Sequence, residues 1–238
     1  MSKKWQIAVT GTFTHLLLGT VYAWSYFQNL ITESAGWNNT QTAWAFSLSI
    51  CMLGVTAAWA GNRMPVYGPR KLAMLGGALY ALDYLISGFA LANRSLVLLY
   101  LGFGIIGGIG LGLAYVTPVA TVSAWFTKKQ GLATGMVVMG FGFGALVMSK
   151  LLAPLFLQLS DGNLSTMFYT VGTLMIVLIP VLASFLQLPK PDEVHEKMQE
   201  KISVARYING KPFIIVSISS FTRHTENADA CRYRLLRQ

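Results

Sequence analysis

Two titratable residues stand deep inside long apolar runs, where the chemistry open to them is the binding and passing on of a proton. His15 lies about ten residues into the run 5–27, and Asp83 lies at a similar depth in the run 72–92. At about 1.5 Å per residue, ten residues of helix reach roughly 15 Å, the middle of a bilayer. A titratable group at this depth predicts a functional site, and a link between His15 and Asp83 would serve proton coupling. The alternative for Asp83 is a structural polar contact.

A lysine and an aromatic stripe add groups that could meet an anion. Lys150 lies near the end of the run 131–152, where its charge would attract an anionic substrate or, alternatively, its side chain would reach the lipid headgroups. Helical spacing places His15 and Tyr22 on one stripe with small glycines between them. We predict that this stripe is the wall of a cavity.

The composition predicts that membrane helices position these residues. The chain is 54% apolar and 11% charged, and its charges gather in a few short stretches and the tail. About 20 apolar residues of helix cross a hydrocarbon core of about 30 Å. No alternation typical of strands is found, and only helices or closed barrels satisfy the backbone in lipid. We therefore predict an all-α, polytopic membrane protein with six transmembrane helices, at residues 5–27, 43–60, 72–92, 97–116, 131–152 and 166–187.

The basic residues in the short connecting segments predict the orientation. Only Arg94 lies on the side opposite the N-terminus, whereas seven lie on the N-terminal side: Lys3, Lys4, Arg63, Arg70, Lys71, Lys128 and Lys129. The positive-inside rule then predicts an inner or plasma membrane protein with both termini in the cytoplasm. The net charge of +9 reflects this bias and the basic tail. No basic face interleaved with exposed aromatic residues indicates nucleic-acid binding, so we expect no nucleic-acid partner.

Sequence motifs for enzymatic chemistry are missing. The chain has no P-loop, no H-E-x-x-H and no G-x-S-x-G pattern. Its two cysteines, Cys51 and Cys231, suggest neither a disulfide nor a metal site. We predict no catalytic residue, no metal, no cofactor and no enzyme activity.

The segment 102–144 combines two glycine-rich apolar stretches with a short basic turn. It reads GFGIIGGIGLGLAYVTPVATVSAWFTKKQGLATGMVVMGFGFG. In lipid, small residues repeated about every four positions allow helix backbones to approach closely. We predict helix-packing roles for Gly108, Gly112, Gly135, Gly140 and Gly144.

The order of these residues resembles a known family. Glycines before Tyr115, the pair Trp125–Phe126 and the later glycines are similar to helix 4, the cytoplasmic turn and helix 5 of the oxalate/formate antiporter branch of the major facilitator superfamily, close to the monocarboxylate porters. The pattern around His15 and Tyr22 is similar to helix 1 of the same group. The resemblance implies transport of small organic anions, such as oxalate, formate or a monocarboxylate, by alternating access between two six-helix halves.

The resemblance also implies site residues. Helices 1 and 4 line the central path in this superfamily, which makes His15, Tyr22 and Tyr115 the substrate-facing candidates; packing with a satisfied hydroxyl is the alternative for the two tyrosines. A gating loop between helices 2 and 3 is implied at Gly61, Gly68, Arg70 and Lys71. The alternative for the basic residues there is anchoring at the membrane surface.

The resemblance divides the chain into three parts. Residues 1–187 resemble the N-terminal six-helix half, residues 188–211 resemble the cytoplasmic linker, and residues 212–238 match nothing in the pattern. The apolar stretch 212–221 is too short to cross a membrane, so we expect a truncated or frame-shifted product with a disordered or truncated tail. The expected partners are the bilayer, a small carboxylate, and a second copy or the missing C-terminal half. The alternatives to a half-porter are a non-transporting membrane fragment with an interaction or regulatory role and a self-paired porter.

Overall fold

The computed structural model describes residues 3–126 and 129–189. The predicted tail at 212–238 and nearly all of the predicted linker at 188–211 lie outside these residues. Every regular element in the described part is a helix, which confirms the predicted all-α fold. Six helical stretches there are long and apolar enough to cross a membrane, as predicted: Lys3–Ala35, Asn39–Tyr67, Pro69–Ala92, Leu96–Trp125, Gln130–Leu159 and Leu164–Ser184.

Three of these spans change their helical winding part-way. The first is α1 (Lys3–Leu18), the 3₁₀ segment η1 (Gly19–Ala23) and α2 (Trp24–Ala35). The fourth is α5 (Leu96–Leu99), the π-helical segment η2 (Tyr100–Gly107) and α6 (Gly108–Trp125). The fifth is α7 (Gln130–Val147), the π-helical segment η3 (Met148–Leu152) and α8 (Ala153–Leu159). The second, third and sixth spans are the α-helices α3 (Asn39–Tyr67), α4 (Pro69–Ala92) and α9 (Leu164–Ser184).

Local sequence signals set several helix ends. Asn38 and Gln41 form a capping box at the start of α3. The Asn38 side chain accepts a hydrogen bond from a backbone N–H of the first turn, and the Gln41 side chain accepts one from the backbone N–H of Asn38. The Asn163 side chain caps α9 through the backbone N–H of Thr166. Gly36 follows α2 with a left-handed backbone, φ 71°, which glycine adopts without steric cost.

The predicted gating loop is shorter in the structure than in the sequence analysis. Gly61 lies inside α3, which continues to Tyr67, and Arg70 and Lys71 lie exposed in the first turn of α4. Pro65 lies in the last turn of α3, where its ring and missing N–H disfavour continuation of the helix, and α3 ends two residues later at Tyr67. Only Gly68, with φ 77°, separates the two helices. The prediction that Gly61 belongs to a loop is therefore wrong.

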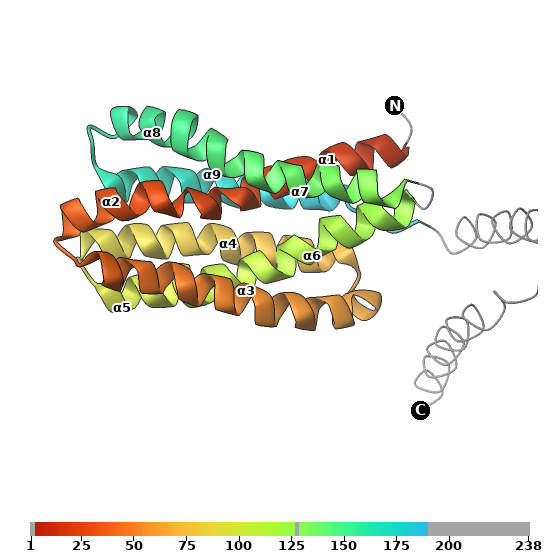
Figure 1. The fold of residues 1–238 in the computed structure, drawn as a ribbon, viewed down its shortest axis with the longest axis horizontal. Coiled ribbons are helices and arrows are strands. Elements are labelled where there is room, and N and C mark those ends of the chain that lie inside the picture. The colour runs from red at the N-terminus through yellow and green to blue at the C-terminus, as the bar shows by residue number, and fades with distance from the viewer. Residues whose placement is uncertain (1–2, 127–128, 190–238) are drawn as a thin grey trace, which may run out of the picture. The chain divides into compact units, whose positions relative to one another are not determined.

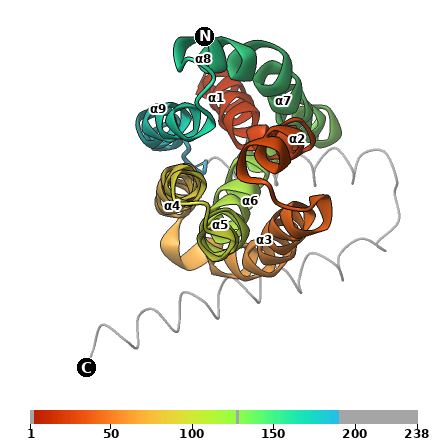
Figure 2. The same cartoon turned by 90° about the vertical axis from the view of Figure 1, so that its left-hand side faces the viewer.

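The helices of the bundle contact one another in a defined set of pairs. The third span, α4, packs most extensively against α9 and α6, and α3 packs along α6 (Figure 1). The α1 helix packs along α7, and Figure 2, which looks along the helices, shows these two side by side. Three spans that the sequence sets apart, the first, fourth and fifth, therefore meet through α1, α6 and α7.

The crossing of α1 and α7 depends on glycine. A Cβ atom at Gly140 would lie 2.5 Å from the Thr12 carbonyl oxygen, and one at Gly144 would overlap the Leu16 carbonyl oxygen. These are approaches of backbone to backbone, which a side chain would block. The helices can lie this close only because both positions lack a side chain.

The α3–α6 crossing also depends on glycines that allow the two backbones to approach closely. A Cβ atom at Gly108 would lie 2.6 Å from the Ser49 carbonyl oxygen, and one at Gly112 would lie 2.7 Å from that of Leu53.

The packing prediction for Gly135 is wrong, because this glycine is exposed and its Cβ position has nothing within 4 Å. Two positions five residues apart on an α-helix point about 140° away from each other, so Gly135 cannot share the face of Gly140.

We expect Gly144→Ala to lower the stability of the bundle by about 1 to 3 kcal/mol, and Gly144→Leu to lower it further. The added atom meets a carbonyl of the facing backbone, which cannot rotate aside as a side chain would. Thermal unfolding of the purified chain in detergent measures the effect. Gly142→Ala is the matched control, since this exposed glycine of the same helix has open space around its Cβ position. Equal melting temperatures for the two alanine variants would show that the close crossing does not exist.

Candidate functional site

Four aromatic side chains from three spans meet at the α1–α6–α7 contact. His15 of α1 lies 5.0 Å from Tyr115 of α6 and 5.6 Å from Phe141 of α7, measured between ring centres. Phe141 also contacts Tyr22 at 5.2 Å and Tyr115 at 5.1 Å, both edge to face. We call these four residues the central aromatic cluster. The structure thus brings together the three candidates His15, Tyr22 and Tyr115.

The central aromatic cluster has a buried end and an open end. The His15 imidazole has no exposed surface, whereas Tyr22 keeps 46% of its surface exposed, and Tyr115 lies half-buried between them. The buried ring nitrogens of His15 have no side-chain hydrogen bond within the described residues, and the backbone of Gly11 is their polar neighbour. The exposed side therefore offers the phenol groups, which can donate hydrogen bonds to an anion.

The 3₁₀ segment η1 sets the direction of Tyr22. With about 3.0 residues per turn, residues three apart are aligned, so Tyr22 lies directly beyond Gly19. The missing side chain of Gly19 allows the backbone carbonyl of Phe141 to come close. Tyr22 can consequently pack on the Phe141 ring while part of it remains exposed.

A hydroxyl cluster holds η1 from the opposite side, and the sequence analysis missed it. The hydroxyl groups of Thr20 and Tyr80 lie 2.9 Å apart, and Tyr84 donates a hydrogen bond of 3.0 Å to Thr20. Tyr80 also donates to the carbonyl oxygen of Leu18 at 3.1 Å. A signal was present: two tyrosines four apart on α4 share one helix face and need partners when buried.

Asp83 lies between the two tyrosines in sequence but faces a different helix. Its side chain is 1% exposed, and neither carboxylate oxygen has a hydrogen-bond partner within the described residues. A Cβ atom at Gly107 of η2 would overlap this carboxyl group. Ser87, one turn later, is also buried with an unpartnered hydroxyl. The structure does not bring His15 and Asp83 into contact, because His15 packs on aromatic rings of α6 and α7 while Asp83 packs on η2. Of the two alternatives for Asp83, the link to His15 is therefore not formed.

The candidate cation Lys150 is apart from the central aromatic cluster. It is exposed in η3 and forms no ion pair, hydrogen bond or ring contact with the residues that the structure describes. The central aromatic cluster itself contains no permanently charged group. As an anion site it would rely on neutral donors alone.

Comparison with known proteins identifies the family. A sequence model of the Major Facilitator Superfamily matches residues 8–225 of the chain. The chain belongs to the Major Facilitator Superfamily. The matched range ends inside the segment 212–238 that the sequence analysis set apart as non-matching. The predicted resemblance to this superfamily is confirmed, and the chain is an integral membrane protein of a transporter family.

Three relatives whose names state a transported substrate match part of this chain. It is 30% identical over 149 residues to mouse monocarboxylate transporter 14, covering 62% of this chain and 28% of the relative. It is 26% identical over 174 residues to the oxalate:formate antiporter of Oxalobacter formigenes, covering 73% of this chain and 40% of the relative. It is 34% identical over 121 residues to apicoplast pyruvate carrier 1 of Toxoplasma gondii, covering 51% of this chain and 22% of the relative. The chain thus spans at most 40% of the length of these relatives.

We expect the Thr20–Tyr80 hydrogen bond to stabilise the facilitator bundle by about 0.6 kcal/mol, with an upper value of about 1.7 kcal/mol. A double-mutant cycle of Thr20→Val and Tyr80→Phe, read by thermal unfolding in detergent, measures this coupling. In the control cycle Thr173→Val replaces Thr20→Val. Thr173 is exposed on α9, and among the residues that the structure describes its hydroxyl bonds only the Tyr169 carbonyl of its own helix, so no coupling to Tyr80 is expected. Full additivity in the Thr20 cycle would contradict the hydroxyl cluster.

Proposed function

We propose that this facilitator chain forms one wall of a transport path for small carboxylates, with His15, Tyr22 and Tyr115 on that wall. The observation that carries the proposal is the central aromatic cluster, which collects three polar aromatic side chains from the first and fourth spans around Phe141. Tyr22 is the most exposed residue of the set. The substrate class comes from the relatives, which are named for monocarboxylates, for oxalate and formate, and for pyruvate.

The path needs a second wall. A carboxylate entering a site of low dielectric requires a positive counter-charge or several donors, because an unpaired buried charge is very costly. The central aromatic cluster offers only neutral donors, and Lys150 is exposed elsewhere. In the proposal, the remaining donors come from a C-terminal half joined through residues 188–211, and substrate crosses as the two halves rock about the site.

Asp83 is the proposed site of proton coupling. An ionised aspartate at mid-membrane costs about 2.5 to 3.5 kcal/mol on insertion scales, and Asp83 has no partner among the described residues to offset this. The carboxyl therefore gains free energy by binding a proton. Its contact with Gly107 of η2 connects this protonation to the packing of the third and fourth spans.

We expect both termini of the bundle in the cytoplasm, because seven of the eight basic residues in the short segments lie on the N-terminal side. Alkaline phosphatase fused after Gln187 should be inactive, since this enzyme requires export. A cytoplasmic reporter fused after Asp161 should be inactive as well, because the turn between α8 and α9 would face the opposite side. Activity of either fusion would reverse the topology.

We expect the chain alone to show no saturable counterflow of labelled oxalate, formate, lactate or pyruvate in proteoliposomes, because it supplies one wall. A chimera in which it replaces the matching part of the oxalate:formate antiporter should restore exchange. In the chimera, Tyr22→Phe should weaken substrate affinity about tenfold, the value of one hydrogen bond to a charged group. His15→Ala should remove exchange, and Asp83→Asn should keep exchange but remove its response to a proton gradient.

Controls separate the three hypotheses for this chain. Tyr67→Phe is the matched tyrosine variant, since Tyr67 is exposed at the end of α3, and it should leave exchange unchanged. Counterflow by the chain alone, lost in His15→Ala, Tyr22→Phe or Lys150→Gln and accompanied by a stable homodimer in detergent, would favour the self-paired porter. A well-folded chimera without exchange would favour a non-transporting membrane fragment.

A further inference from the structure

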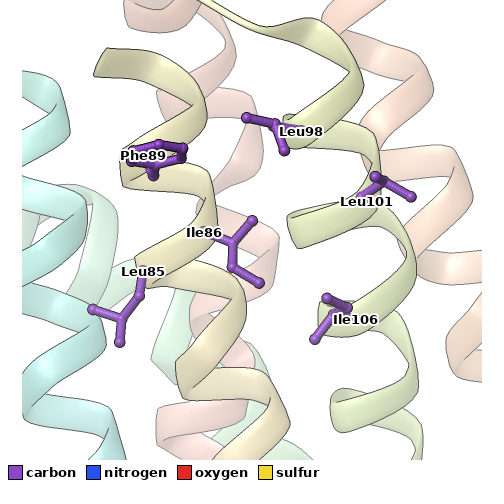
Figure 3. A pocket seen from close by; sticks show the side chains of 6 residues that line it. All are labelled: Leu85, Ile86, Phe89, Leu98, Leu101 and Ile106. Carbon is purple, nitrogen blue, oxygen red and sulfur yellow. The ribbon is translucent and has the colours of Figure 1, made fainter. Parts of the chain in front are cut away.

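An apolar groove opens on the side of the bundle between the third and fourth spans. It has a volume of about 460 Å³ and is lined by Leu85, Ile86, Phe89, Leu98, Leu101 and Ile106. Figure 3 shows the first three side chains on α4 and the last three on the neighbouring α5–η2 helix, with Ile86 between the two helices and Leu85 on the opposite side of α4. Phe89 and Leu101 are about half exposed, so the groove faces the surroundings rather than the core of the bundle.

A basic residue lies in the turn that joins the two helices lining this groove. Arg94 belongs to the short turn between α4 and α5, the two helices whose side chains form the walls. Asn93 and Ser95 on either side have their side chains engaged, with the Phe89 carbonyl and the Leu98 backbone N–H respectively. Arg94 is exposed and makes no ion pair or side-chain hydrogen bond within the described residues. Its backbone is left-handed, with φ 48°, where glycine or asparagine would be the ordinary choice.

The dimensions fit one leaflet of a bilayer. Leu85 precedes Arg94 by nine positions, so the groove reaches roughly 14 Å below the turn at 1.5 Å per residue. Half of the hydrocarbon core is about 15 Å thick. A chain that enters at the level of Arg94 and follows the groove would end near the middle of the bilayer, as an acyl chain does.

We propose that this groove binds one acyl chain of an anionic phospholipid whose phosphate contacts Arg94. The lining residues are apolar, and the turn that joins the two lining helices carries the exposed charge of Arg94; together they are the complement of a lipid with an acidic headgroup. A helix of another chain is the poorer occupant. Helices associate in lipid through small residues that allow close approach, whereas this groove is lined by leucine, isoleucine and phenylalanine only.

The test is native mass spectrometry of the full chain released from detergent with phosphatidylglycerol or phosphatidylcholine of identical acyl chains. Arg94→Gln should weaken binding of phosphatidylglycerol about fivefold, the usual value of one basic residue near an anionic membrane, and should change phosphatidylcholine little. Arg94→Lys should retain most of the binding. Arg63→Gln is the matched control, because Arg63 is exposed near the far end of α3. Equal binding of phosphatidylglycerol to wild type and Arg94→Gln would overturn the proposal.

A second measurement tests the acyl chain itself. Phosphatidylglycerol carrying a photoreactive group on its acyl chain should label the peptides that contain residues 85–89 and 98–106, and Ile86→Trp, which fills the groove, should reduce this labelling. Val97→Trp is the control, since Val97 is exposed on α5 but does not line the groove. Labelling spread evenly over the bundle would overturn the acyl-chain site. So would a wild-type dimer that Ile86→Trp converts to a monomer, since a helix of another copy would then occupy the groove.

Discussion

The close approach of backbones at glycine is the constraint on which this bundle depends. Lipid tails offer apolar side chains as good an environment as another helix does, so helices hold together only where packing is tight. At the α1–α7 crossing, Gly144 faces both the Leu16 carbonyl and Gly19, whose Cα would be 3.1 Å from an added Cβ. His15 and Phe141 flank this crossing in sequence. The central aromatic cluster is therefore positioned by the same glycines that hold the two helices together.

The fourth span extends this principle to two neighbours at once. Glycines at a spacing of four face α3, and they are Gly104, Gly108 and Gly112. Another set faces α4, and it consists of Gly102, Gly107 and Gly110. The step of five residues between Gly102 and Gly107 suits the wider winding of the π-helical segment η2, in which residues about five apart become aligned. The irregular winding thus allows one helix to present glycine to two partners, and it brings Asp83 against Gly107.

The sequence predicted the spans and the glycine crossings because both follow from local composition and spacing. It did not predict η1, η2 or η3, since a change of winding depends on which neighbour each face meets. For the same reason it could not exclude Gly135 from the packing glycines or identify Phe141, an ordinary apolar residue until it lies among His15, Tyr22 and Tyr115. Gly61 was misplaced because the apolar run ends several residues before α3 does. The hydroxyl cluster links residues 60 or more positions apart, and no local pattern pairs Thr20 with Tyr80.

The buried polar groups of the bundle divide into two kinds, and the division has a functional meaning. The hydroxyl groups of Thr20, Tyr80 and Tyr84 form hydrogen bonds with one another, which fixes η1 against α4. Because η1 is fixed, Tyr22 of the same segment keeps its orientation against Phe141 of α7. Asp83 and Ser87 have no partner among the described residues. An unpaired polar group is costly in lipid, so a conformation or protonation state that satisfies it is favoured. In the proposed function, the satisfied set would stabilise the wall of the path, and Asp83 and Ser87, which lie on α4 with Tyr80 and Tyr84, would favour a change in the packing of α4 against η2.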